Sequence, residues 1–358
     1  MTEFSPHSPA GLDARSAGGR FPAGAGRAAT VYTDSDADRG VLEGRTVAVL
    51  GYGNQGAAQA KNMRDSGVGG LIVGNRDDEY LPPARDAGFT THPIADAARA
   101  ADVALLLIPD EVQPAVFAEQ IAPGLTAGNT LVVASGYNVA FGLLDVPDGV
   151  DVVMVAPRMI GAAVRTRYED GSGYPCFVSV ERDAGGNALA TALAVASAIG
   201  GTRAGAVASS AREEAALDLF SEQAIWPAVM AVLRTSYEVL HAAGFSDEAV
   251  LNEMYLSGEP AEVFAHVARQ GLLGQLGLHS HTSQYGQLRG LASVDTSDLA
   301  RRFTTVLRDD ILSGAFAKEW SEVSADPERR LDELRSRAAR HPLAEAERAV
   351  MADAEARS

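Results

Sequence analysis

The sequence predicts an α/β protein in which a mainly parallel, doubly wound sheet is followed by an all-helical domain. Apolar runs typical of buried strands recur between residues 46 and 180, and the segments between them suit helices of about ten residues. The first run leads directly into the glycine-rich turn GYGNQG. Beyond Ser209 the apolar residues repeat at roughly the helical period, and strand-like runs cease. We therefore expect a sheet domain over 31–208 and a helical domain over 209–358.

The composition favours a globular protein that acts on small molecules. With 46% hydrophobic residues in 358 the chain can fill proper cores, and its formal charge of −17 repels nucleic acids and anionic membranes. Cys176 is the only cysteine, which excludes an intrachain disulfide and a thiolate-rich zinc site. Residues 1–30 are predicted to be a disordered lead-in. No signal peptide and no unbroken apolar run of roughly 20 residues is present, so we expect a cytoplasmic protein.

Each expected element follows from a local pattern. The run TVAVL at 46–50 predicts the first strand, and AAQAKNMRDSG predicts the helix after the turn. The C-terminal stretch DPERRLDELRSRAARHPLAEAERAV predicts a charged amphipathic helix pair with a solvated face. The remaining strands are expected at 71–73, 103–108, 131–134, 152–155 and 176–180.

The glycine-rich turn predicts a dinucleotide site. In its G-x-G-x-x-G pattern, Gly51 turns the chain, Gly53 admits the pyrophosphate and Gly56 lets the helix approach the strand. The phosphates would lie at the helix N-terminus. A merely glycine-rich turn is the alternative, but the flanking strands and helix favour cofactor binding in a Rossmann-type domain. The expected contacts are Gly51, Tyr52, Gly53, Asn54, Gln55 and Gly56.

The loop after the second strand bears on the choice between NADH and NADPH. Arg76 could pair with a 2′-phosphate or stack on the adenine, whereas the neighbouring acids Asp77, Asp78 and Glu79 favour free ribose hydroxyls and repel a phosphate. We expect NADH, with NADPH as the alternative and Arg76 and Asp78 as cofactor contacts. Solvated loop charges that touch no ligand are the plainer interpretation.

Nine segments share their order and spacing with one enzyme family. They are GYGNQGAAQAKNMRDSG, LIPDEVQPAVF, SGYNVAFG, MVAPR, RYEDGSGYP, GGTRAG, DLFSEQ, SQYG and ILSGAFAKEW. Together they resemble ketol-acid reductoisomerase (acetohydroxy acid isomeroreductase) of the short, class I type, from about Tyr32 to Met351. The resemblance implies a Rossmann domain, a helical domain with a knotted path and an active site completed by a second protomer. It also implies that Pro109, Ser135 and Gly161 lie beside the cofactor.

The resemblance further implies Mg²⁺ held by carboxylates. The family converts 2-acetolactate or 2-aceto-2-hydroxybutyrate by alkyl migration and then hydride transfer, and paired Mg²⁺ ions withdraw charge from adjacent oxygens during migration. Asp218 and Glu222 match its D-x-x-x-E metal motif, although an exposed acidic helix face has the same spacing. Glu253 matches a ligand from the partner subunit. Ser257 replaces the family's fourth carboxylate, a position that Glu259 could take instead.

Two more departures fall on catalytic positions. Ser135 stands where the family has a histidine, and Arg158 stands where it has a lysine. Because arginine keeps its proton at any useful pH, acid-base work at that position is impaired. Ser280 and Thr282 match the family's S-x-T segment, whose serine contacts the substrate carboxylate, with helix capping or a loop hydrogen bond as the alternative.

Three functions stay open at this point. The first is a divergent NAD(P)H-dependent, Mg²⁺-assisted reductase of a small 2-keto or 2-imino acid, with alkyl migration lost or weak. The second is a working ketol-acid reductoisomerase of branched-chain amino-acid synthesis, and the third is a non-catalytic nucleotide-binding partner protein. A homodimer or higher homo-oligomer is expected. The catalytic candidates are Ser135, Arg158, Asp218 and Glu222.

Overall fold

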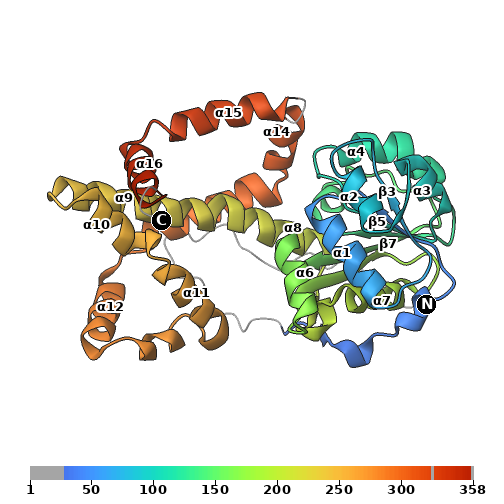
Figure 1. The fold of residues 1–358 in the computed structure, drawn as a ribbon, viewed down its shortest axis with the longest axis horizontal. Coiled ribbons are helices and arrows are strands. Elements are labelled where there is room, and N and C mark those ends of the chain that lie inside the picture. Colours follow the sequence, from blue (N-terminus) through green and yellow to red (C-terminus); the bar gives the residue numbers. More distant parts are fainter. Residues whose placement is uncertain (1–27, 324–325, 356–358) are drawn as a thin grey trace. The chain divides into compact units, whose positions relative to one another are not determined.

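The computed structural model describes residues 28–323 and 326–355, so nearly all of the predicted lead-in lies outside the described residues. The chain divides into two compact units with a boundary between Leu219 and Phe220 (Figure 1). The sequence suggested a boundary near Ser209, where strand patterns cease. The first helix after that point, α8 (Ala211–Phe220), lies almost wholly in the sheet unit.

The first unit is built on one nine-stranded sheet in the order β1-β9-β8-β7-β6-β5-β2-β3-β4. The pairings are parallel except for those between β1 and β9 and between β7 and β8. A mainly parallel, doubly wound sheet is thereby confirmed. The strands are β1 (Val31–Tyr32), β2 (Val47–Leu50), β3 (Leu71–Gly74), β4 (Thr90–His92), β5 (Val103–Leu106), β6 (Thr130–Val133), β7 (Asp151–Pro157), β8 (Cys176–Arg182) and β9 (Ala206–Ala208).

Helices cover both faces of this sheet. Alternate side chains of the central strands, such as Leu105 and Val132, pack with α7 on one face, whereas Leu106 and Val133 pack with α3 on the other. Burial on both faces explains why these strands read as continuous apolar runs. The helices are α1 (Asn54–Asp65), α2 (Leu81–Asp86), α3 (Ile94–Ala100), α4 (Gln113–Val116), α5 (Tyr137–Ala140), α6 (Gly161–Glu169), α7 (Ala188–Ile199) and α8.

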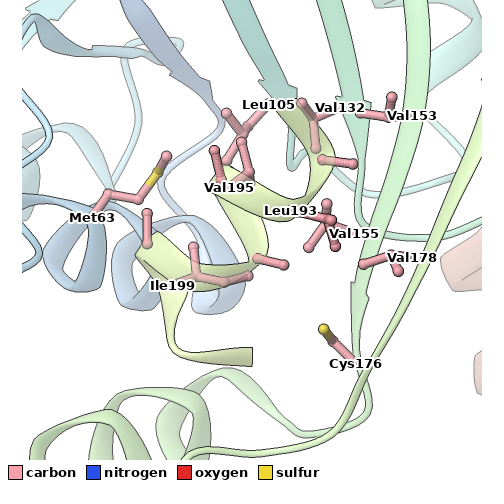
Figure 2. Packing of buried hydrophobic residues seen from close by; sticks show 14 of the residues in the cluster. Met63, Leu105, Val132, Val153, Val155, Cys176, Val178, Leu193, Val195 and Ile199 are labelled. Atoms are coloured by element: carbon pink, nitrogen blue, oxygen red, sulfur yellow. The ribbon is translucent and has the colours of Figure 1, made fainter. Parts of the chain in front are cut away.

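The larger core lies on the α7 face. Figure 2 shows side chains of α7 meeting those of strands β5 to β8 and of α1. Cys176 belongs to this core, and burial raises the pKa of its thiol to about 12. It is therefore a packing residue, because a buried protonated thiol is a poor nucleophile.

The second unit contains only helices among its described residues, as expected. They are α9 (Trp226–Ala242), α10 (Asp247–Leu251), α11 (Glu259–Gln270), α12 (His281–Ser293), α13 (Ser297–Thr305), α14 (Ala315–Val323), α15 (Pro327–Ala338) and α16 (Pro342–Glu355). The predicted charged helix pair corresponds to α15 and α16. A small core joins α9, α10 and α16 through Tyr237, Val250, Leu251, Ala346 and Val350.

The helical run Ala211–Ala242 is long and apolar enough, by length and composition alone, to cross a membrane. Charged residues such as Arg234 and Glu238 interrupt it, so the sequence contains no unbroken apolar stretch of that length. Of the most apolar 18 residues of this run, only 11% are buried within the chain.

Candidate functional site

The turn between β2 and α1 has the geometry of a phosphate cradle. Gly51 has φ +101°, and a Cβ on Gly56 would lie 1.9 Å from the carbonyl oxygen of Gly51, so both positions require glycine. A Cβ on Gly53 would meet nothing within 4 Å, so this glycine faces open space. Gly53 also forms the N-cap of α1 without a side-chain cap, which leaves the first-turn N–H groups to an anion. These features fit a dinucleotide pyrophosphate.

One added methyl group is expected to affect fold stability at Gly56 and cofactor binding at Gly53. Gly56→Ala is expected to destabilise the fold by about 3 kcal/mol, because its Cβ would collide with backbone. Gly53→Ala should unfold at nearly the wild-type urea concentration but bind NADH at least about tenfold more weakly, because its methyl group would occupy the pyrophosphate approach. Urea unfolding and NADH fluorescence titration of both variants check this. Equal cofactor affinity in wild type and Gly53→Ala would contradict the assignment.

A hydrogen-bonded chain shapes the loop after β3. The Tyr52 N–H donates to Asn75 Oδ1 at 3.0 Å, and Asn75 Nδ2 donates to Asp78 Oδ1 at 2.8 Å. Asp78 Oδ2 accepts from Arg76 Nε at 2.6 Å. Burial tends to raise the pKa of Asp78, but the hydrogen bonds from Arg76, the Tyr80 N–H and Asn75 lower it overall. An ionised Asp78 therefore holds the loop and Arg76 together, while the Arg76 side chain stays 75% exposed.

The loop after β7 packs against the glycine-rich turn. Gln55 Nε2 donates to the carbonyl oxygen of Met159 at 2.9 Å, and a Cβ on Gly161 would lie 2.2 Å from the carbonyl oxygen of Asn54. The predicted cofactor residues Gln55 and Gly161 are thereby brought together at the carboxyl ends of the parallel strands. This edge is where open α/β sheets bind their ligands.

Arg158, the first residue after β7, lies between two carboxylates of α8. Its Nη1 donates to Glu214 Oε1 at 2.5 Å, and its Nη2 donates to Asp218 Oδ1. The guanidinium also lies over the Phe177 ring, 5.2 Å from the centroid. Desolvation tends to lower the pKa of Arg158, but Asp218 and Glu214 raise it overall, so the guanidinium stays charged. A fixed positive charge therefore stands at the position where the family has lysine.

Glu214 is a site residue that the sequence patterns did not reveal. Its side chain is 2% exposed, and its Oε2 accepts from the Gly136 N–H at 2.7 Å while its Oε1 accepts from Arg158. Burial raises the pKa of Glu214, opposed by the Gly136 N–H and by Arg158. Glu214 thus ties the loop after β6 to Arg158. Its position four residues before Asp218, on the same helix face, was the available signal.

Asp110 is a second site residue that the sequence patterns missed. It follows Pro109 after β5 and accepts hydrogen bonds from Ser135 Oγ at 3.3 Å and from Gln113 Nε2 at 3.0 Å. Burial, reinforced by the charges of Glu111 and Asp218, raises the pKa of Asp110 against the effect of its hydrogen bonds. The Ser135 hydroxyl thus lies beside a carboxyl group that holds its proton more tightly than usual. Pro109 and Ser135 both fall at the strand edge that carries the cofactor turn.

The remaining predicted residues lie in the helical unit. Glu222 and Glu253 are exposed and lie in the π-helical turns Ser221–Ile225 and Asn252–Leu256, a distortion frequent at functional sites. Ser280 caps α12 by accepting from the Ser283 N–H at 3.2 Å, and Thr282 is exposed on that helix. The capping alternative is thus present for Ser280. The substrate role of Ser280 and Thr282 stays a prediction.

The groups around Asp218 support the predicted metal site only in part. One oxygen of its carboxylate carries the Arg158 guanidinium, so a cation at Asp218 would share the carboxylate with a fixed positive charge. Among residues 28–323 and 326–355, no three His, Cys, Asp or Glu side chains form a metal-binding group. A carboxylate oxygen is nevertheless the donor that Mg²⁺ prefers. The residues fit Mg²⁺ only with further ligands, such as those expected from a second protomer.

Comparisons with known proteins agree with this architecture. Residues 41–205 match the acetohydroxy acid isomeroreductase NADPH-binding domain, and residues 212–355 match the ketol-acid reductoisomerase C-terminal domain. Ketol-acid reductoisomerase (NADP(+)) of Pseudarthrobacter chlorophenolicus is 39% identical over 320 residues, which are 88% of this chain and 92% of that protein. The corresponding protein of Pyrobaculum aerophilum is 40% identical over 321 residues, 88% of this chain and 95% of that protein.

A solved structure extends the agreement to three dimensions. The NADH-preferring ketol-acid reductoisomerase from an uncultured archaeon matches with a TM-score of 0.82 and 30% identity, over 90% of this chain and 98% of that one. Both domains of the family are therefore present in order. The chain belongs to the ketol-acid reductoisomerase family of NAD(P)H-dependent oxidoreductases.

Proposed function

We propose that this chain reduces a small 2-keto or 2-imino acid with NAD(P)H and that the family's alkyl migration is weak or lost. The observation that carries the proposal is the clamp at Arg158, which is held by Glu214 and Asp218 at the strand edge beside the cofactor turn. The Ser135 hydroxyl beside Asp110 supports it, because a neutral hydroxyl replaces the family's imidazole. The cofactor cradle is retained while the groups expected to serve migration are changed.

Reduction places few demands on these residues. NAD(P)H, when held at the glycine-rich turn, would supply the hydride for a carbonyl or imine carbon, and the substrate oxygen or nitrogen would then need one proton. Arg158 keeps a positive charge at the strand edge and there offsets the charges of Glu214 and Asp218. Asp110, whose pKa burial raises, accepts a hydrogen bond from Ser135 Oγ and is the carboxyl group placed to deliver that proton. Mg²⁺, where bound by Asp218, Glu222 and a Glu253 from a second copy of this chain, would withdraw charge from a substrate oxygen.

The direct test is oxidation of NADH or NADPH by the full-length protein with a panel of small 2-keto and 2-imino acids in the presence of Mg²⁺. We expect turnover of at least one member, with Gly53→Ala as the control that keeps the fold but binds the cofactor poorly. Cofactor binding without oxidation across the whole panel would contradict the proposal. That result would favour the non-catalytic nucleotide-binding protein instead.

A complete ketol-acid reductoisomerase is the second candidate. It is favoured by identity near 40% to relatives of that name, over 88% of this chain. Asp218, Glu222 and Glu253 all match the family's metal motifs. The two candidates differ in one step, alkyl migration, and can therefore be separated on one protein with two substrates.

For the cofactor we expect a modest preference for NADH. Asp78, together with Asp77 and Glu79, crowds the region of a 2′-phosphate. Asp78 also forms an ion pair with Arg76, which would otherwise be available to pair with that phosphate. One carboxylate-phosphate repulsion at a wet surface is worth on the order of 1 kcal/mol, or several-fold in affinity. Asp78→Ser should shift the preference toward NADPH more than Asp77→Asn does, because Asp78→Ser also releases Arg76 from its ion pair. Titration that shows NADPH preferred by more than about tenfold in the wild type would overturn this assignment.

We expect a dimer or larger as the smallest active unit. On α9 the apolar side chains Trp226, Met230, Val232 and Val239 are 55–64% exposed, and large apolar side chains left open to water in this number favour an interface with another chain. A second helical unit would cover it and bring Glu253 to the Asp218 and Glu222 of its partner. Light scattering should give at least twice the mass of one chain, and Met230→Lys should dissociate the assembly and abolish activity. An active monomer in solution is the result that would refute this expectation.

A further inference from the structure

We propose that Arg158 acts as a built-in counter-ion to Asp218, so that this chain binds a divalent metal ion more weakly than it would with lysine or a neutral residue at position 158. The inference rests on the proposed metal role of Asp218. It adds to the proposed function that one residue of the sheet unit, Arg158, sets how strongly the metal ion binds. It follows from how Arg158, Glu214 and Asp218 are held together.

The guanidinium is fixed from several directions. The Arg158 backbone N–H donates to the carbonyl oxygen of Pro175 at 2.9 Å, which places the residue directly after β7. The side chain then stacks on Phe177, and its two terminal nitrogens reach Glu214 and Asp218 separately. The Arg158 side chain is 29% exposed. Such a forked, stacked arginine is preorganised and is not easily displaced.

Glu214 prevents Arg158 from moving away from the site. Its side chain is 2% exposed and would be left as a buried charge, satisfied only by the Gly136 N–H, if Arg158 swung toward solvent. Arg158 also cannot become neutral by losing a proton, because guanidinium stays charged at any useful pH. A cation that approaches Asp218 therefore meets a permanent positive charge on the same carboxylate.

A lysine at this position would behave differently. Its ammonium is one compact charge on a flexible stem, and it cannot donate from two separate nitrogens to two carboxylates. It could stay with Glu214 and leave both oxygens of Asp218 to a metal ion. We infer that arginine in place of lysine at position 158 supplies Asp218 with a positive charge from the protein itself. The attraction of Asp218 for a metal ion is weaker as a result.

The test measures Mn²⁺ binding, which needs neither substrate nor cofactor. Free Mn²⁺ is followed by electron paramagnetic resonance during titration of the full-length wild type, Arg158→Lys and Arg158→Gln. We expect both variants to bind Mn²⁺ at least about tenfold more tightly, and Asp218→Asn added to Arg158→Lys should remove the gain. Arg165→Lys is the matched control, because Arg165 also bridges two carboxylates, Asp65 at 2.6 Å and Glu169 at 2.8 Å, away from this cluster.

The outcomes separate this inference from the proposed function. Equal affinity in the wild type and in both Arg158 variants, or no Mn²⁺ binding by any variant, would overturn the inference. A gain that survives Asp218→Asn would overturn it as well, because the metal would then lie elsewhere. Should Arg158→Gln fail to fold, Arg158→Lys keeps the charge opposite Glu214 and still decides the question. Failure of the reductase proposal appears instead as absent NADH oxidation in the keto-acid and imino-acid panel.

Discussion

The purified wild-type protein, supplied with Mg²⁺ and NADH, is expected to convert 2-acetolactate about a thousandfold more slowly than it reduces 3-hydroxy-3-methyl-2-ketobutyrate. The second compound is the already rearranged intermediate, so it requires hydride transfer alone. Migration requires charge to be withdrawn from two adjacent oxygens, for which two metal ions are suited. Loss of one directly bonded carboxylate from such a pair removes on the order of several kcal/mol of charge stabilisation, which corresponds to this factor in rate.

Three positions carry this expectation. Ser257 is exposed and accepts a long hydrogen bond, at 3.4 Å, from the Glu259 N–H, and a neutral hydroxyl is a weak ligand for Mg²⁺. Ser135 replaces an imidazole with a hydroxyl that bonds Asp110. Arg158 places a guanidinium on Asp218. Hydride transfer depends mainly on placing the nicotinamide against a polarised carbonyl, so it should suffer less.

Restoring the family residues provides the internal control. The triple variant Ser135→His, Arg158→Lys, Ser257→Glu should recover part of the migration activity while its reduction of the rearranged keto acid changes little. Steady-state rates on both substrates measure this, with circular dichroism to check the fold. A wild type that converts 2-acetolactate as readily as the rearranged keto acid would instead support the complete reductoisomerase.

The second large effect concerns stability rather than chemistry. Glu214→Ala is expected to lower the free energy of unfolding by about 3–5 kcal/mol, because it leaves the Arg158 guanidinium without one of its two carboxylates and the Gly136 N–H without an acceptor. Urea unfolding measures the loss. Glu213→Ala is the matched control, since Glu213 is exposed on the same helix turn and should cost less than about 0.5 kcal/mol. Equal effects of the two substitutions would show that the clamp does not stabilise the fold.

The sequence predicted the central fold because buried parallel strands are continuous apolar runs with a characteristic glycine turn. The strands β1, β4 and β9 escaped prediction because they are only two or three residues long, and β4 (TTH) has no apolar run. Their pairing with neighbouring strands is a long-range effect that no local pattern contains. The contact-based boundary of the sheet unit lies about ten residues after the expected one, because α8 has a helical pattern but packs with the sheet unit.

The candidate site was predictable where a motif fixes backbone geometry. Gly51 and Gly56 have the turn and the close backbone approach that their spacing indicates, and Gly53 faces open space. Glu214 and Asp110 were missed because their importance depends on burial and on partners far along the chain, 56 residues away for the pair of Arg158 and Glu214. The effect of arginine at position 158 was also only half predicted. Its loss of acid-base capacity follows from its chemistry, whereas its bond to Asp218 depends on the fold.

Internal competition between the two substrates tests the central claim most directly. Both compounds give the same product, 2,3-dihydroxy-3-methylbutyrate, so ¹³C-labelled 2-acetolactate can be mixed with an equal amount of unlabelled 3-hydroxy-3-methyl-2-ketobutyrate. The label in the product then reports the ratio of the two kcat/KM values within one reaction. Reduction without migration predicts a product that is almost free of ¹³C. A product labelled in proportion to the mixture would contradict the account and establish that alkyl migration survives in this protein.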